Sequence, residues 1–189
     1  MASIKKEDII LCAFNILKFS GIEHVNARAI AKELNTSVQP IFYQFKNMNE
    51  VKEKLLNYAL DYYKKYLLNF TDNLPKYKQV GLNYIGFAQN EANIFKFIFM
   101  GNYQIDINNF NDFDSSYSLV EEILEEYNDL SNEDAKSIHL KMWLFTHGIA
   151  SLIATKTCCF SNSYISDLLT NEFNALIANA KRKEVKDEN

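Results

Sequence analysis

The side chains best suited to chemistry are three histidines and three cysteines, and their spacing argues against a metal centre. They are His24, His139, His147, Cys12, Cys158 and Cys159. On one predicted helix the second and third histidines are eight residues apart and the first of the paired cysteines lies eleven further on, so one zinc ion cannot reach all three. An odd cysteine number with two neighbours predicts no disulfide framework and fits a reducing cytoplasm. We expect no metal and no cofactor.

Catalytic patterns are also missing from the sequence. It contains no glycine-rich phosphate loop, no H-E-x-x-H and no G-x-S-x-G. Four carboxylates cluster at Glu121, Glu122, Glu125 and Glu126, in the pattern of a solvated helix face. His147 is interpreted as a core or pocket-wall residue. We therefore assign no catalytic residue and expect the protein not to be an enzyme, although a small-molecule enzyme on the helical half remains the third alternative.

Composition predicts an all-α protein of about nine helices. The 189 residues are 48% hydrophobic and include only five glycines and two prolines, so few residues break helices. The most apolar segment, 142–154, is interrupted by Thr146 and His147, and no secretory signal is recognisable, so we expect a cytoplasmic protein without a membrane span. Helices are predicted at 5–19, 27–34, 37–44, 48–70, 76–89, 92–100, 116–127 and 132–158, followed by one capped by Ser163.

Charge is distributed unevenly along the chain. The net charge is -4, but residues 1–70 carry ten Lys or Arg against seven Asp or Glu, whereas the remainder carries ten against seventeen. The N-terminal third is therefore the part suited to facing phosphate. We place a domain boundary at Asn47, the predicted cap of the long fourth helix, which gives domains 1–47 and 48–189.

The segment TSVQPIFYQFK, residues 36–46, has the properties of a helix that reads DNA. We predict that this segment and the helix before it form a helix-turn-helix. Ala31 is small where the two helices would cross, and Asn35 can take the left-handed conformation that the tight turn needs. Ile41 and Phe45 should then be buried, and Ser37 should cap the helix. The residues left facing outward are Val38, Gln39, Pro40, Phe42, Tyr43 and Gln44. A glutamine can bond adenine through two hydrogen bonds, and apolar neighbours can touch a thymine methyl.

The arrangement resembles the DNA-binding domain of the TetR family of transcriptional regulators. The similarity runs without gaps through IILCAFNIL at 9–17, GIEHVNARAIAKEL at 21–34 and TSVQPIFYQFKNMNEV at 36–51. It implies that Arg28 and Lys46 hold phosphates, that Ser37 opens the recognition helix, and that further contacts come from Thr36, Val38, Gln39, Pro40, Phe42 and Tyr43. Three residues depart from the family pattern: Phe42 replaces tyrosine, Met48 replaces lysine and Asn26 replaces threonine.

The C-terminal half carries a second, shorter resemblance. WLFTHGIASLI at 143–153 resembles the Trp-x-x-x-His-Gly segment in the ligand-binding domain of one branch of this family. The resemblance implies that the helix contributes to a ligand pocket and a dimer surface. Pocket candidates chosen for composition and placement are Tyr84, Phe97, Met100, Trp143 and His147.

Together these patterns predict a homodimeric regulator that is released from DNA by a small molecule. Its partners would be a near-palindromic DNA operator, a second copy of the chain and a hydrophobic effector, neutral or cationic, with no membrane. The main alternative is a helical interaction protein that keeps the fold without specific DNA binding. It is motivated by the modest positive charge of the N-terminal third and by the departures at Phe42 and Met48.

Overall fold

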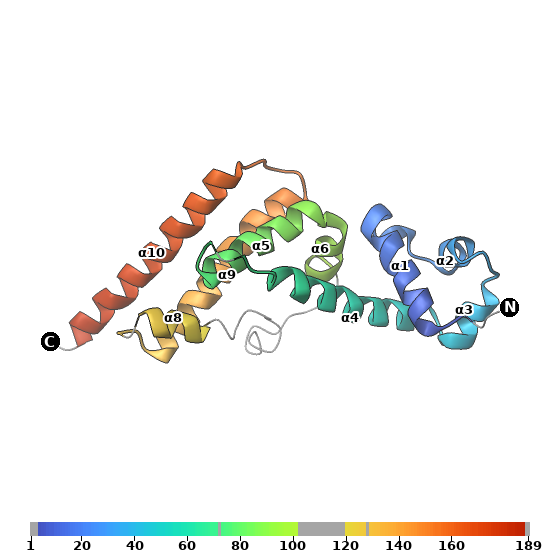
Figure 1. Ribbon diagram of the computed structural model, residues 1–189, viewed down its shortest axis with the longest axis horizontal. Coiled ribbons are helices and arrows are strands. Elements are labelled where there is room, and N and C mark those ends of the chain that lie inside the picture. The colour runs from blue at the N-terminus through green and yellow to red at the C-terminus, as the bar shows by residue number, and fades with distance from the viewer. Residues whose placement is uncertain (1–3, 72, 102–119, 128, 188–189) are drawn as a thin grey trace. The chain divides into compact units, whose positions relative to one another are not determined.

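The chain is built from helices that form two compact units (Figure 1). The computed structural model describes residues 4–71, 73–101, 120–127 and 129–187. One unit contains the chain up to Lys65 and a segment that begins at Glu91; the other contains Tyr66–Asn90 and the described part of the chain beyond the first unit. The described residues include no strand, so the all-α prediction is confirmed.

The first helix, α1 (Lys6–Ser20), supplies the central apolar stripe of the N-terminal unit. Ile9, Ala13 and Leu17 recur at helical spacing and are completely buried. The helix ends because Gly21 takes a φ of +95°, which L-residues with a side chain rarely adopt, and its N–H donates to the Leu17 carbonyl at 2.9 Å.

Helices α2 (Ala27–Glu33) and α3 (Gln39–Gln44) form the predicted helix-turn-helix. The side chain of Asn26 accepts a hydrogen bond from the Ala29 N–H at 3.0 Å, as expected for a cap. In the turn, Asn35 has a φ of +49°, which confirms its left-handed conformation. Ile41 and Phe45 are 0% and 2% exposed and hold α3 against the core.

The start of α3 differs from the prediction. Val38, rather than Ser37, is the cap residue, and no side chain caps the helix. The Val38 carbonyl accepts hydrogen bonds from the N–H groups of Ile41 and Phe42, at 3.2 and 3.4 Å, so the first helical turn closes there. Pro40 is consequently the second helical residue, where a missing N–H costs no hydrogen bond.

Helix α4 (Met48–Leu67) begins at the expected cap, where the Asn47 side chain accepts from the Glu50 N–H at 3.1 Å. The α1–α4 face of the N-terminal unit is closed by α6 (Ala92–Phe99). Lys18 Nζ on α1 lies 2.6 Å from Glu91 Oε1, and the Tyr62 hydroxyl on α4 donates to the same oxygen at 2.8 Å. We call these three residues the Lys18–Glu91–Tyr62 node.

The second unit packs α5 (Lys76–Asn90) against α9 (Asn132–Ala154), and both contact α10 (Asn162–Asp187). A short helix, α8 (Val120–Glu126), also contacts α9. The expected Ser131 cap is confirmed by a 3.0 Å hydrogen bond from the Asp134 N–H. The last helix is capped by Ser161 rather than Ser163, because Ser161 Oγ accepts from the Tyr164 N–H at 3.2 Å. The predicted loop at 101–115 and the start of the helix predicted at 116–127 lie mostly outside the described residues.

Replacing Glu91 by Gln should destabilise the N-terminal unit. The Lys18 pKa is raised, chiefly by its hydrogen bond to Glu91, so the ammonium is charged at neutral pH and its contribution to stability is lost as the pH rises through the folded-state pKa. We expect a loss of about 1–2 kcal/mol in the free energy of unfolding, measured by urea denaturation at pH 7.5. Asp129→Asn, which breaks the exposed Asp129–Lys181 pair, is the control and should leave the midpoint unchanged. Equal effects of the two substitutions would contradict the role given to the node.

Candidate DNA-binding surface and effector cavity

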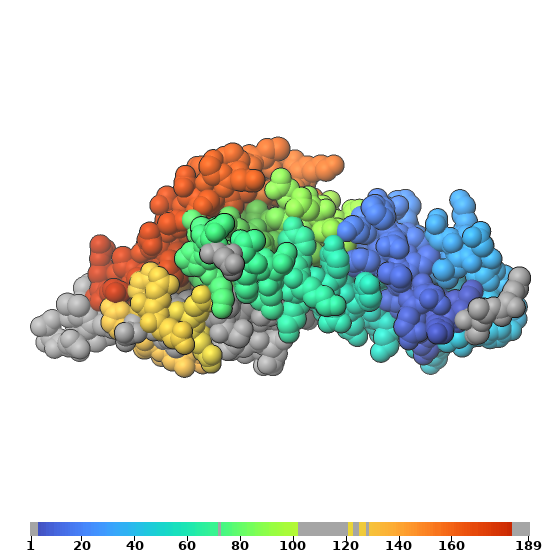
Figure 2. All heavy atoms as spheres, viewed as in Figure 1, coloured from blue at the N-terminus to red at the C-terminus, as the bar shows by residue number. Residues whose placement is uncertain are grey.

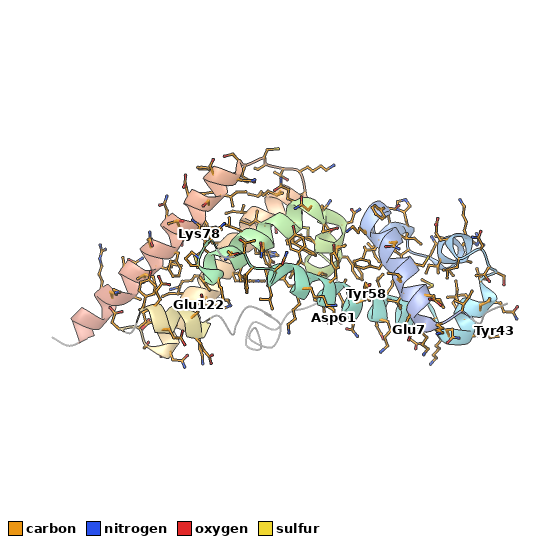
Figure 3. All side chains as sticks on the ribbon, in the orientation of Figure 1. Glu7, Tyr43, Tyr58, Asp61, Lys78 and Glu122 are labelled. Carbon is orange, nitrogen blue, oxygen red and sulfur yellow. The ribbon has the colours of Figure 1, made fainter. Side chains whose placement is uncertain are left out.

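The exposed face of α3 presents the residues that the sequence predicted to contact DNA. Val38, Phe42 and Tyr43 are 38%, 45% and 74% exposed, although large apolar side chains are usually buried. Tyr43 is labelled on α3 in Figure 3. Figure 2 shows the atoms of the first three helices, in blue shades, packed against one another. The core therefore holds α3 in place through its other side and leaves this face available.

Gln39 and Tyr43 form a hydrogen-bonded pair on this face. Gln39 Nε2 donates to the Tyr43 hydroxyl at 2.6 Å, one helical turn away. The bond orients the carboxamide and leaves its oxygen and its second N–H available for a base edge. The sequence placed both residues on the outer face but did not predict this pairing.

Gln44, which the sequence predicted to face outward, does not belong to this surface. Its Nε2 donates to the Ile4 carbonyl at 3.1 Å, and the side chain is half-buried. The bond ties the end of α3 to the segment before α1, so Gln44 fixes the helix instead of reading DNA. Lys6 on α1 reaches the same place, with Nζ 5.3 Å from the centre of the Phe45 ring. Sequence reasoning assigned Lys6 no role.

Exposed cations flank the α3 face. Arg28 on α2 and Lys46 after α3 are both exposed, as phosphate-binding residues must be. The Lys46 backbone N–H donates to Glu50 Oε2 at 2.6 Å, which fixes the chain at this residue. Thr36 is half-buried in the turn, and its N–H donates to the Ala31 carbonyl at 2.9 Å.

The C-terminal unit contains a cavity of about 330 Å³ between α5, α8, α9 and α10, within the size range of small-molecule sites. Most of its lining is apolar or aromatic. The lining residues are Leu74, Pro75, Tyr77, Lys78, Val80, Gly81, Tyr84, Glu122, Glu126, Tyr127, His139, Met142, Trp143, Thr146, Leu169, Thr170 and Phe173. We call this candidate ligand site the effector cavity.

Two of the five predicted pocket residues, Tyr84 and Trp143, line the effector cavity, and His147 contacts both. The Tyr84 hydroxyl is 2.8 Å from His147 Nδ1, and the Trp143 ring stacks on the imidazole with centroids 5.1 Å apart. Phe97 and Met100 are not among the described residues that line this cavity. They belong to the segment beginning at Glu91 in the first unit, where Phe97 is buried.

A second tyrosine–histidine pair lines the cavity next to the first. The Tyr77 hydroxyl is 3.1 Å from His139 Nδ1, and His139 is 4% exposed. Tyr77 and Tyr84 are about two helical turns apart on α5, and His139 and His147 are about two turns apart on α9. The two tyrosine–histidine pairs therefore lie one after the other between these helices. The spacing of the histidines argued against a metal site, but no pattern in the sequence predicted their tyrosine partners.

The histidines and cysteines are not arranged as a metal site. In the part of the chain that the structure describes, no three His, Cys, Asp or Glu side chains are close enough to hold an ion. Cys12 is buried, and burial raises the pKa of its thiol, so it is held as a thiol. Cys159 is exposed and Cys158 half-buried, in the turn after α9.

Similarity to solved structures identifies the fold as that of TetR-family regulators. ActR, a TetR-family protein of Streptomyces coelicolor crystallised in complex with (S)-DNPA, matches with a TM-score of 0.59 and 15% identity, over 95% of this chain and 100% of ActR. HI0893, a TetR-family transcriptional regulator of Haemophilus influenzae, matches with a TM-score of 0.61 and 16% identity, over 90% of this chain and 94% of the other. No protein-family model and no curated protein matches the sequence. The predicted resemblance is confirmed at the level of the fold.

A search of the described helices for a membrane span finds none that combines sufficient length with sufficient apolar character.

His147 should bind its proton at a lower pH than an exposed histidine does, because its pKa is lowered. Burial lowers the pKa of His147 below 6.5, so the unfolded state binds its proton first and the folded state loses stability as the pH falls below about 6.5. Trp143 is the only tryptophan, and a protonated imidazole stacked on it quenches its emission. We expect an acid quench with a midpoint below pH 6.5 that disappears in His147→Gln and persists in His24→Gln. A midpoint at or above pH 6.5 would contradict the effect assigned to burial.

Proposed function

We propose that the protein is a DNA-binding transcriptional regulator of the TetR type, acting as a homodimer that a small molecule releases from DNA. The observation that carries the proposal is the helix-turn-helix whose core-facing side holds α3 while Val38, Gln39 and Tyr43 remain exposed. The regulator class of the matched folds supports it. Residues 1–47 would bind DNA, and residues 48–189 would bind the effector and the second subunit.

DNA recognition would divide between the face of α3 and the cations beside it. Val38, Gln39 and Pro40 would meet base edges in the major groove, whereas Arg28 and Lys46 would neutralise phosphates. Phe42 is exposed but has no hydroxyl to donate to a phosphate, so it would contact the sugar-phosphate backbone through its ring alone.

Release by a small molecule is supported by the effector cavity. The cavity is apolar, is bordered by helices of one unit and contains hydrogen-bonding groups fixed by their partners. ActR, which shares the fold, was crystallised with a small molecule. Effector and DNA would be coupled if the two ligands prefer different conformations of the dimer.

The dimer surface would lie on α9. Leu144 and Leu152 are 52% and 39% exposed, and the residue between them at four-residue spacing is Gly148. A Cβ built on Gly148 would meet nothing within 4 Å, so the stripe is open in the single chain. On α10, Tyr164 adds another apolar residue that is 53% exposed. A second copy would bury this stripe at close backbone approach, as small residues between leucines allow.

Mixed-sequence DNA should bind with an affinity that falls steeply with salt, since several phosphates are neutralised. Lys46→Ala should weaken binding to all sequences alike and reduce the slope of log K against log salt by about one per subunit. Fluorescence anisotropy over a range of salt concentrations measures both. Lys136→Ala, an exposed lysine on α9, is the matched control and should leave the slope unchanged.

A slope near zero for the unsubstituted protein would refute DNA binding. It would favour the alternative of a helical interaction protein, which the departures at Phe42 and Met48 motivate. A change of sequence preference in Lys46→Ala would instead refute only the phosphate role of Lys46.

The double substitution Leu144→Glu with Leu152→Glu should dissociate the dimer. Each subunit would lose two apolar contacts of about 1.5–3 kcal/mol and gain charges at the interface, so the dissociation constant should rise at least ~100-fold. Sedimentation velocity as a function of concentration measures it. Phe19→Glu, at a residue that is 77% exposed on α1, is the control and should leave the dimer intact. An unchanged dimer in the double variant would place the interface elsewhere.

A further inference from the structure

Lys78 is the only lysine or arginine among the residues that line the effector cavity. Its ammonium donates to Thr170 Oγ1 at 2.9 Å, which links α5 to α10. The same hydroxyl donates to the Ser166 carbonyl at 2.8 Å, so its proton is already engaged and its lone pair faces the ammonium. Lys78 is therefore held at a fixed place in the wall of the cavity.

In the described part of the chain, no carboxylate pairs with the positive charge of Lys78. No carboxylate of a described residue lies within ion-pair distance of its Nζ. An ammonium group has three N–H donors, and the Thr170 hydroxyl accepts from one of them. A half-buried cation beside apolar walls is stabilised when an anion is brought to it.

The two carboxylates of the lining are placed differently. Glu122 and Glu126 belong to α8, a helix of seven residues; Glu126 is exposed to solvent, and Glu122 is half-buried, as Lys78 is. Figure 3 labels Glu122 on α8 and Lys78 on α5, two separate helices that border the cavity. Among the described residues no hydrogen bond holds either carboxylate, whereas the ammonium is held by the Thr170 hydroxyl between two long helices. The fixed charge of the cavity is thus the positive one.

We propose that the effector cavity binds an apolar monocarboxylic acid, with its carboxylate on Lys78 and its apolar body among the aromatic walls. The aromatic residues of the wall are Tyr77, Tyr84, Tyr127, Trp143 and Phe173, and a volume of about 330 Å³ admits a body of one or two rings. This replaces the neutral or cationic effector expected from the acidic composition of the C-terminal half. The inference rests on the proposed function only where it makes such an acid the effector. Binding of the acid to the cavity does not depend on DNA binding.

The test uses three probes with one carbon skeleton: 4-phenylbutyrate, 4-phenylbutanamide and 4-phenylbutylammonium. None absorbs at 295 nm, so the emission of Trp143, the only tryptophan and a lining residue, reports occupancy directly. The butyrate should bind at least ~10-fold more tightly than the amide, the usual gain when a charged acceptor meets a charged donor. The ammonium probe should bind most weakly.

Three variants of the full-length protein locate the charge preference. Lys78→Met keeps the length of the side chain without the charge and should lower the affinity for the butyrate to that for the amide, with the amide affinity unchanged. Thr170→Val removes the hydroxyl that positions the ammonium and should weaken the butyrate by a smaller factor. Lys136→Met, on the exposed face of α9, should match the unsubstituted protein. Circular dichroism melting establishes that each variant is folded.

Each contrary result has a definite meaning. Equal affinities for the three probes, or no change in Trp143 emission with any of them, would overturn the proposal. Tightest binding of the ammonium probe would overturn it in favour of recognition by Glu122 and Glu126. The salt dependence of DNA binding, measured on unsubstituted protein and Lys78→Met without probe, tests the regulator separately: a steep slope with no acid preference refutes this inference alone.

Discussion

Burial of one side of α3 is the constraint on which the N-terminal unit depends. A six-residue helix has too few backbone hydrogen bonds to be stable in water by itself. Ile41 and Phe45 are buried almost completely against the core that includes Ile9, Ala13 and Leu17 of α1 and Ile30 of α2. Because adjacent helical residues point about 100° apart, anchoring these two forces Gln39 and Tyr43, on the opposite side of the helix, to the surface. The residues proposed to read DNA are therefore exposed as a consequence of packing.

In the C-terminal unit, polar side chains lie in the wall of a largely apolar cavity and must be hydrogen-bonded there. Each polar side chain in its wall that carries a described hydrogen bond has a partner on another helix: Tyr77 with His139, Lys78 with Thr170 and Tyr84 with His147. Partnering is required because an unsatisfied buried polar group destabilises the folded state by a few kcal/mol. The same hydrogen bonds fix the side chains at defined places, which is what a selective binding site needs.

The features that could be predicted from the sequence are those determined by neighbouring residues. The caps at Asn26, Asn47 and Ser131 depend on side chains within three residues, and the left-handed Asn35 on a local turn, so all four were predictable. The all-α class followed from the scarcity of glycine and proline.

Features that depend on distant residues could not be predicted. Gln44 bonds a carbonyl 40 residues away, and Lys78 bonds a hydroxyl 92 residues away, and no periodicity of the sequence encodes either pairing. Phe97 and Met100 were chosen for composition and placement in the chain, but the contacts of their segment group it with the N-terminal unit. Tyr84 and Trp143, chosen in the same way, do line the cavity, because both are large side chains on the two helices that pack together.

The division into two units has a consequence for how the protein can diverge. Of the described residues, none that lines the effector cavity belongs to the unit that holds α3. Substitutions at Lys78 or Gly81 can therefore alter which molecule fits without removing any side chain that supports the recognition helix, and the reverse holds for Val38 or Gln39. Additivity of distant substitutions makes such changes independent in their effect on stability. Under the proposed function, a gene duplicate could acquire a new effector while retaining its operator, or a new operator while retaining its effector.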